Sequence, residues 1–554
     1  MNEHDSTTSI TTVFRAKTIL TMNPAQPTAT HVAVRDGRIL AVGTESDVLA
    51  WGEVQRDDQY AEKILMPGLI EAHCHLHEGV VWLYVYVGYY DRKGPDGKIW
   101  KGLKTIDEVV ARLSEHAKKI DADKHIVGWG FDPIYFGSER MTVNDLNKVS
   151  TDRAVAVMHA SMHLMNTNSL ALERAGIDRD TDIEGIVRFE NGEPTGELLE
   201  FAAMFPVTRL LGNPFRTLGQ TPECLDMFGK VAQVAGVTTA TDLVNELHEE
   251  GIVSMSKHTM RPDYPLRIVP AASGMLFGRN VEQCLEKLSA LLPYNHDKLH
   301  LGMVKLVIDG SIQGFTARLR WPGYFNGAPN GIWVTSPADI DGIVEKYHQA
   351  GVQLHIHTNG DEATEITLNA IEKALEKFPR PDHRHTLQHC QMADTAQFQK
   401  IARLGMCVNL FANHLFYWGD AHYDMTMGPD RANRMDACGT ASRLGIPLAI
   451  HSDAPITPIG PLFTAWCAVN RQTASGRVLG ESERITVDQA LYAITMGAAT
   501  TLKMEDKIGS IEVGKFADFC VLESDPTQAK PENLKDVVVA GTILGGRPMP
   551  LPKA

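Results

Sequence analysis

Two histidines, His73 and His75, directly follow the apolar run at residues 64–70. Side chains on a β-strand alternate between its faces, so a strand that ends in His-x-His presents both imidazoles on one side. Two neutral imidazole nitrogens on one rigid face are half of a divalent-metal site. An isolated pair of this kind more often represents two hydrogen-bonded structural histidines, so its interpretation depends on the rest of the chain.

Further candidate ligands follow other apolar runs, far along the chain. His357, His389 and Asp453 each lie at the C-terminal end of such a run. One such histidine would more often be structural, and Asp453 alone would more often cap a helix that begins at Ala454-Pro455. Recurrence of these residue types at several predicted strand ends is difficult to explain by packing and favours a shared metal site.

Lys305 lies inside the apolar run at residues 301–309 and shares one face with Asp309. A lysine in a fully buried strand is rare unless it is paired or used chemically. One interpretation is a Lys305–Asp309 ion pair. The other is a lysine that bridges two metal ions, carboxylated on its amine, because a carbamate can offer an oxygen to each metal.

The elements that position these residues alternate apolar runs with helical stretches, which predicts βα units around a parallel sheet. Eight strands are expected, at residues 64–75, 236–242, 266–273, 301–309, 352–357, 385–389, 406–411 and 447–453. Eight is the number that a TIM-like (β/α)8 barrel, an α/β fold, needs. The first two are too far apart for one connection. We therefore expect a large insertion after the first barrel strand, at about residues 80–230.

Both ends of the chain contain short β segments, with an Asp36-Gly37 hairpin signal near the N-terminus. We expect a small composite β-sandwich built from residues 1–66 and 501–554. Residues 67–500 then form the barrel with its insertion.

At this point the chain resembles the amidohydrolase superfamily, in the YtcJ-like branch of metal-dependent hydrolases that includes N-substituted formamide deformylase. The resemblance spans nearly the whole chain and rests on six motifs: 67–75, Lys305 with 309–311, 357–361, 384–389, 452–455 and 509–518. It implies the barrel and the composite β domain.

By position, the resemblance also implies that His73, His75 and Asp453 hold one metal ion, and that His357 and His389 hold a second, with Lys305 between them. We expect two divalent ions, zinc in particular. A metal-bridging hydroxide would attack a carbonyl carbon, and Asp453 would carry the water's proton to the leaving nitrogen.

The chain departs from the usual family pattern at three places: Glu71 replaces a common Asp, residues 311–316 differ, and His451 is unusual before Ser-Asp. These departures leave the expected metal site intact. They bear on the identity of the substrate.

Substrate contacts are predicted less directly. Trp82, Trp129 and Trp418 belong to aromatic-rich segments near the expected barrel mouth, which favours an apolar or aromatic substrate, although aromatic side chains are more often core. His163 matches a position where the family carries a histidine near the site. Arg318 could bind a carboxylate.

Composition limits the remaining possibilities. A net charge of -15 argues against nucleic acid or an anionic membrane as a partner. The N-terminus carries no signal-peptide pattern, and the eight cysteines form no Cys-x-x-Cys, so we expect a cytoplasmic protein with reduced thiols. A homodimer acting on a small molecule is the expected state.

Three functions compete. The first is a binuclear hydrolase of an amide-type C–N bond. The second is a mononuclear deaminase of the same superfamily, against which Lys305 argues. The third is a non-catalytic scaffold, which would be marked by lost ligands, and none is missing.

Overall fold

The computed structural model describes residues 10–137 and 139–551. At its centre is an eight-stranded parallel sheet in the order β21-β20-β19-β18-β17-β16-β15-β6. Along the chain these strands are β6 (Leu69–Glu71), β15 (Val237–Asn245), β16 (Arg267–Ser273), β17 (Met303–Val307), β18 (Gln353–Thr358), β19 (Thr386–His389), β20 (Cys407–Leu410) and β21 (Leu448–Ile450). A parallel bridge between Cys74 and Ala454 links the ends of the two outer strands, which gives a TIM-like barrel.

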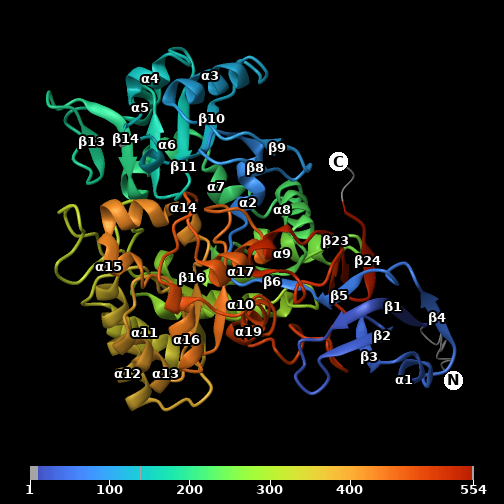
Figure 1. Ribbon diagram of the computed structural model, residues 1–554. Coiled ribbons are helices and arrows are strands. Elements are labelled where there is room, and N and C mark those ends of the chain that lie inside the picture. Colours follow the sequence, from blue (N-terminus) through green and yellow to red (C-terminus); the bar gives the residue numbers. More distant parts are fainter. Residues whose placement is uncertain (1–9, 138, 552–554) are drawn as a thin grey trace.

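Helices alternate with these strands and lie on the outside of the sheet (Figure 1). They are α8 (Pro222–Val234), α9 (Glu249–Thr259), α10 (Val281–Leu291), α11 (Ile340–Gln349), α12 (Asp361–Lys377), α13 (Thr395–Arg403) and α16 (Cys438–Arg443). Their buried apolar faces join the sheet's outer face in one large core cluster. The predicted βα alternation is confirmed from β15 onward.

The first predicted strand, 64–75, is wrong as a single element. It divides at Gly68 into β5 (Ile64–Pro67), which pairs with a C-terminal strand, and β6, which pairs with β15. A Cβ atom on Gly68 would lie 1.9 Å from the Thr238 hydroxyl, so only glycine allows the chain to pass so closely from one sheet to the other.

Strands from both ends of the chain form a second eight-stranded sheet, in the order β24-β23-β22-β5-β1-β2-β3, with β4 also on β1. Its strands are β1 (Thr11–Leu20), β2 (Thr28–Arg35), β3 (Arg38–Gly43), β4 (Val54–Asp57), β5, β22 (Phe519–Leu522), β23 (Val539–Leu544) and β24 (Arg547–Met549). Asp36 and Gly37 form the β2–β3 turn with φ angles of 51° and 75°. The pairing runs through one continuous sheet, whereas the predicted sandwich would have two.

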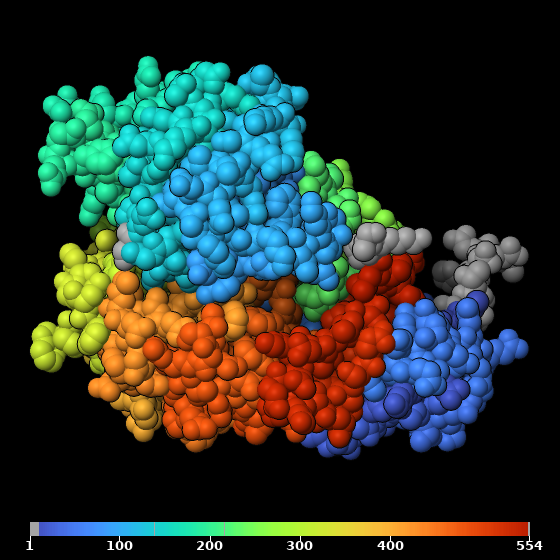
Figure 2. Space-filling view, turned by 45° about the horizontal axis from the view of Figure 1, so that its top comes forward, coloured from blue at the N-terminus to red at the C-terminus, as the bar shows by residue number. Residues whose placement is uncertain are grey.

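The segment between β6 and β15 forms a layer of its own above the barrel (Figure 1). Its six-stranded sheet has the order β13-β14-β12-β11-β10-β7, from β7 (Val85–Tyr86), β10 (Ile126–Phe131), β11 (Val155–His159), β12 (Leu164–Thr167), β13 (Ile186–Arg188) and β14 (Pro194–Leu199). Helices α3 (Ile106–Ala117), α4 (Val143–Asn147), α5 (Ser169–Ala175) and α6 (Glu200–Leu210) accompany it. Two apolar clusters give the layer its own core, and in Figure 2 it lies against the orange barrel segments.

None of the described helices combines the length and apolar character needed to cross a membrane. All eight cysteines are buried and unpaired.

Candidate metal centre

Three predicted ligands from the two outer strands of the barrel meet at its C-terminal end. The Asp453 carboxylate lies 3.0 Å from His75 Nε2 and 3.3 Å from His73 Nε2. Ligand atoms of these three residues lie within 4.8 Å of one another. The His73 backbone carbonyl also accepts a hydrogen bond from the Asp453 amide, which fixes the two strand ends together.

The backbone is strained at two of the predicted ligands, Asp453 and His389. Asp453 and His389 have φ angles of 54° and 65°, in the left-handed region that residues with a Cβ rarely adopt. Such conformations cost about 1–3 kcal/mol each and persist where surrounding structure enforces them, often at functional sites. No helix begins at Asp453, since the next one, α17, spans Pro461–Asn470. The helix-cap interpretation of Asp453 is therefore excluded.

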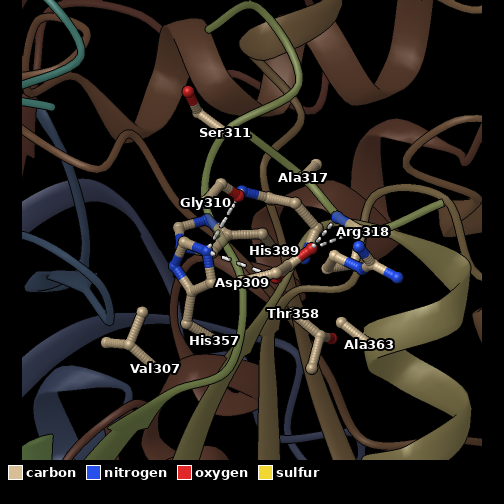
Figure 3. Close-up of polar contacts among 12 residues, drawn as sticks. Val307, Asp309, Gly310, Ser311, Ala317, Arg318, His357, Thr358, Ala363 and His389 are labelled. Atoms are coloured by element: carbon tan, nitrogen blue, oxygen red, sulfur yellow. Dashed lines mark hydrogen bonds and ion pairs between the residues drawn. The ribbon is translucent and has the colours of Figure 1, made fainter. Parts of the chain in front are cut away.

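His357 and His389 lie next to each other, with ring centroids 4.5 Å apart. His389 Nδ1 is 3.9 Å from Asp453, whereas His357 Nε2 is 3.7 Å from Asp309. Asp309 lies between His357 and the backbone of Arg318 (Figure 3). His357 thus lies on the Asp309 side of the cluster.

Lys305 is buried, and its Nζ donates a hydrogen bond to His73 Nε2 at 3.3 Å. Burial lowers the pKa of Lys305 to about 7. The Lys305–Asp309 ion pair does not form, because Asp309 instead accepts hydrogen bonds from the backbone amides of Arg318, Asn359 and Gly360 at 2.8–3.0 Å.

Gln388, which the sequence interpretation missed, organises the layer beneath the ligands. Its Oε1 accepts hydrogen bonds from His73 Nδ1 at 2.7 Å and from Asn409 at 2.9 Å, while its amide donates to His355 at 2.7 Å. Because an amide oxygen can only accept, His73 carries its proton on Nδ1, and the lone pair on Nε2, which accepts from Lys305, is the one that can ligate a metal. The signal was present: Gln388 directly precedes His389 in a buried strand.

Glu71, noted only as a departure from the family pattern, holds the Asp453 segment. Its carboxyl group accepts hydrogen bonds from the Ser452 amide at 3.1 Å and the Ser452 hydroxyl at 2.7 Å. The contact joins the start of the His-x-His segment to the residue before Asp453.

The donor set fits a divalent metal. Buried ring nitrogens without a hydrogen-bond partner include His75 Nδ1 and His389 Nδ1. Burial holds the pKa values of His73, His357 and His389 well below normal, so these imidazoles are neutral, the form that binds metal. Neutral imidazoles beside a carboxylate are ligands that suit zinc.

One predicted substrate contact, His163, comes from the insertion. Its Nδ1 donates to Glu200 at 2.9 Å. Burial alone would lower the pKa of His163, but Glu200 outweighs it, and Asp453 and Asp309 also act on it, so the net pKa is raised.

The predicted aromatic contacts occupy different places. Trp418 is buried, donates its indole N–H to Asp132 at 3.0 Å, and lines a pocket with Tyr86, Tyr90 and Ile456. Trp129 is only 1% exposed and belongs to the insertion core, with the half-buried Trp82 packed edge-on against it.

Arg318 is already engaged. Its guanidinium pairs with Glu362 at 2.9 Å and donates to the Gly331 carbonyl, pointing away from His357 (Figure 3). In this arrangement its guanidinium is directed toward Glu362 and away from the candidate centre.

Comparisons with known proteins identify the family of this chain. The model of the Amidohydrolase family matches residues 61–550. The YtcJ protein of Bacillus subtilis (strain 168) is 29% identical, covering 87% of this chain and 88% of its own. N-substituted formamide deformylase of Arthrobacter pascens is 26% identical, covering 95% and 96%.

Solved structures share the fold. An uncharacterized metal-dependent hydrolase from Pyrococcus horikoshii OT3 has a TM-score of 0.71 at 21% identity, covering 94% of this chain and 99% of its own. An adenosine deaminase from Xanthomonas campestris with bound zinc has a TM-score of 0.52 at 14% identity, covering 98% and 93%. The matched family model spans most of the sequence and includes every ligand candidate, and the chain belongs to the amidohydrolase family of metal-dependent hydrolases.

Proposed function

We propose that this protein hydrolyses a C–N bond in a small amide that carries an apolar or aromatic group. The observation that carries the proposal is the meeting of His73, His75 and Asp453 with His389 and Lys305 at one end of the barrel. Likeness to N-substituted formamide deformylase supports the C–N bond. The aromatic side chains around Trp418, which line a small pocket with Ile456 three residues beyond Asp453, favour the apolar group.

Two divalent ions, zinc by preference, would be held by His73, His75 and Asp453 on one side and by His357 and His389 on the other. When bound, such ions lower the pKa of water and polarise a carbonyl oxygen. Lys305 would link the two sides as a carbamate, formed when its amine nitrogen bonds to the carbon of CO2 and loses a proton. Its burial without a carboxylate partner among the described residues supports this role.

Asp453 is the proposed proton carrier. Its carboxylate accepts the proton of the attacking water and returns it to the leaving nitrogen, which contributes about 10²–10⁴-fold to the rate. The strained backbone at Asp453 and the contacts from Glu71 to Ser452 hold this carboxylate in place. His163, held by Glu200, would donate a hydrogen bond to the substrate from the insertion side.

A mononuclear deaminase is the second candidate. Among the described residues, two sets of three ligand atoms lie close enough to hold one metal ion: His73 with His75 and Asp453, and His73 with His389 and His451. Both sets contain His73, and neither contains His357. His73, His75 and Asp453 are enough to hold one ion by themselves, and the fold is shared with a zinc-bound deaminase.

The test is a screen of the zinc-loaded protein against formamides, other amides, ureas, lactams and amino-heterocycles, with zinc counted per chain. Release of an amine and a carboxylic acid with two zinc ions supports the proposal. Release of ammonia from a heterocycle with one zinc ion selects the deaminase. No stoichiometric zinc and no turnover on any of these substrates would rule out both.

A further inference from the structure

His451 is a buried histidine that the proposed ligand set leaves without a role. It directly follows β21 and lies two residues before Asp453, with no exposed surface. Along a strand, residues two apart share a face. Its ring therefore belongs to the same inner side of the barrel as Asp453, closer to the barrel's centre.

Both ring nitrogens of His451 lack a hydrogen-bond partner. Within the described part of the chain, it is the one histidine for which both nitrogens are buried and unpartnered. A neutral imidazole has one N–H donor and one acceptor nitrogen. Leaving a buried polar group without a partner costs about 1–3 kcal/mol. A ligand for one of these nitrogens would remove part of that cost.

The surroundings of His451 identify the class of ligand. Its ring centroid lies 4.6 Å from that of His73 and 5.0 Å from that of His389. One ligand atom from each of the three histidines lies within 4.8 Å of the other two. On its remaining side the ring stacks on Phe411, which offers no hydrogen bond. Three neutral imidazoles are a donor set for a nitrogen-preferring transition metal.

We infer that His451 is an additional metal ligand, acting with His73 and His389. This assignment rests on the proposed metal centre and extends it: His451 adds a buried nitrogen donor where the His73 side and the His389 side of the centre meet. Zinc, cobalt or copper would be favoured over magnesium and manganese, because imidazole suits the former and oxygen ligands suit the latter.

Substitution of His451 by cysteine provides a direct test, since thiolate ligation to cobalt produces a charge-transfer band in the near ultraviolet. His451→Cys loaded with cobalt should show this band. The wild type, whose eight cysteines are buried and unpaired, and His385→Cys, at the opposite end of the barrel, should not. Stoichiometric cobalt in His451→Cys without the band would overturn the inference.

A second variant keeps the inference testable if the cysteine disturbs folding. His451→Gln should weaken zinc retention against a chelator by about tenfold or more, whereas His385→Gln should not. Equal retention in His451→Gln and wild type would contradict a ligand role. A wild type that binds no zinc would instead contradict the proposed function.

Discussion

The barrel holds a cluster of buried histidines at each end, and the two clusters differ in what their nitrogens contact. At the N-terminal end, His348 bonds to His385 at 2.8 Å and to the Phe378 carbonyl at 2.7 Å. His383 bonds to the Leu404 carbonyl at 2.7 Å. None of these ring nitrogens is among the buried unpartnered atoms of the described residues.

At the C-terminal end, His75, His389 and His451 all have buried nitrogens without a partner, and Asp453 lies among them. Yet both ends carry a His-x-His pair, His73 with His75 and His383 with His385. Burial lowers the pKa of His385 as it lowers that of His389. The two clusters therefore share the His-x-His spacing and the burial of their rings. They differ in whether the ring nitrogens have hydrogen-bond partners, and this difference separates the structural cluster from the proposed ligating cluster.

The largest effect that we predict for a substitution in the C-terminal cluster is a loss of turnover. Asp453→Asn should retain the fold and lose about 10²–10⁴-fold in kcat, because an amide cannot carry the proton. Steady-state kinetics on the best substrate of the screen, with circular dichroism for folding, measures it. Near-normal turnover would remove the proton-carrier role under either proposed reaction.

Metal content is the next measure. Lys305→Ala should lose at least one of two zinc ions per chain, because the proposed link between the two halves of the centre is removed. Elemental analysis after gel filtration gives the stoichiometry. Two zinc ions and full activity in Lys305→Ala would show that this lysine is a buried structural residue.

A matched pair of substitutions compares the two clusters directly. His389→Gln should lose metal with little change in the melting temperature of the metal-free protein. His385→Gln should keep metal and lose about 1–3 kcal/mol of stability, because His385 accepts a hydrogen bond from the Leu354 amide and bonds to His348.

Metal analysis and thermal unfolding of both variants decide the matter. If His385→Gln also releases metal, or if His389→Gln keeps it, unpartnered nitrogens do not distinguish ligands in this barrel.

The last effect, which leaves metal content unchanged, concerns a buried carboxyl group outside both clusters. Burial raises the pKa of Asp132 to about 6, although Ile134 and Trp418 donate hydrogen bonds to it. The folded protein therefore keeps a proton that the unfolded chain releases above its normal pKa of 3.8, so the stability from this group falls as pH rises through 6.

Asp132→Asn should consequently be more stable relative to wild type at pH 7 than at pH 4, by at most about 3 kcal/mol. Melting temperatures of both proteins at the two pH values measure this. A difference that does not change with pH would show that Asp132 stays ionised in the folded protein.

The sequence alone indicated the parallel barrel and the large insertion, because apolar runs of strand length and helical periodicity are local properties. It also placed His73, His75, His357, His389 and Asp453 at strand ends. It did not show that residues 64–75 divide at Gly68, since that depends on the close approach of Thr238 from another strand.

Tertiary structure alone decided which polar groups have partners. Asp309 accepts three backbone amides and so leaves Lys305 to His73. Arg318 forms an ion pair with Glu362, and Gln388 orients the His73 ring through a hydrogen bond. The sequence identifies the donors and acceptors but does not give the distances between residues on different strands. The unpartnered nitrogens of His451 therefore became visible only once the barrel brought its strands together.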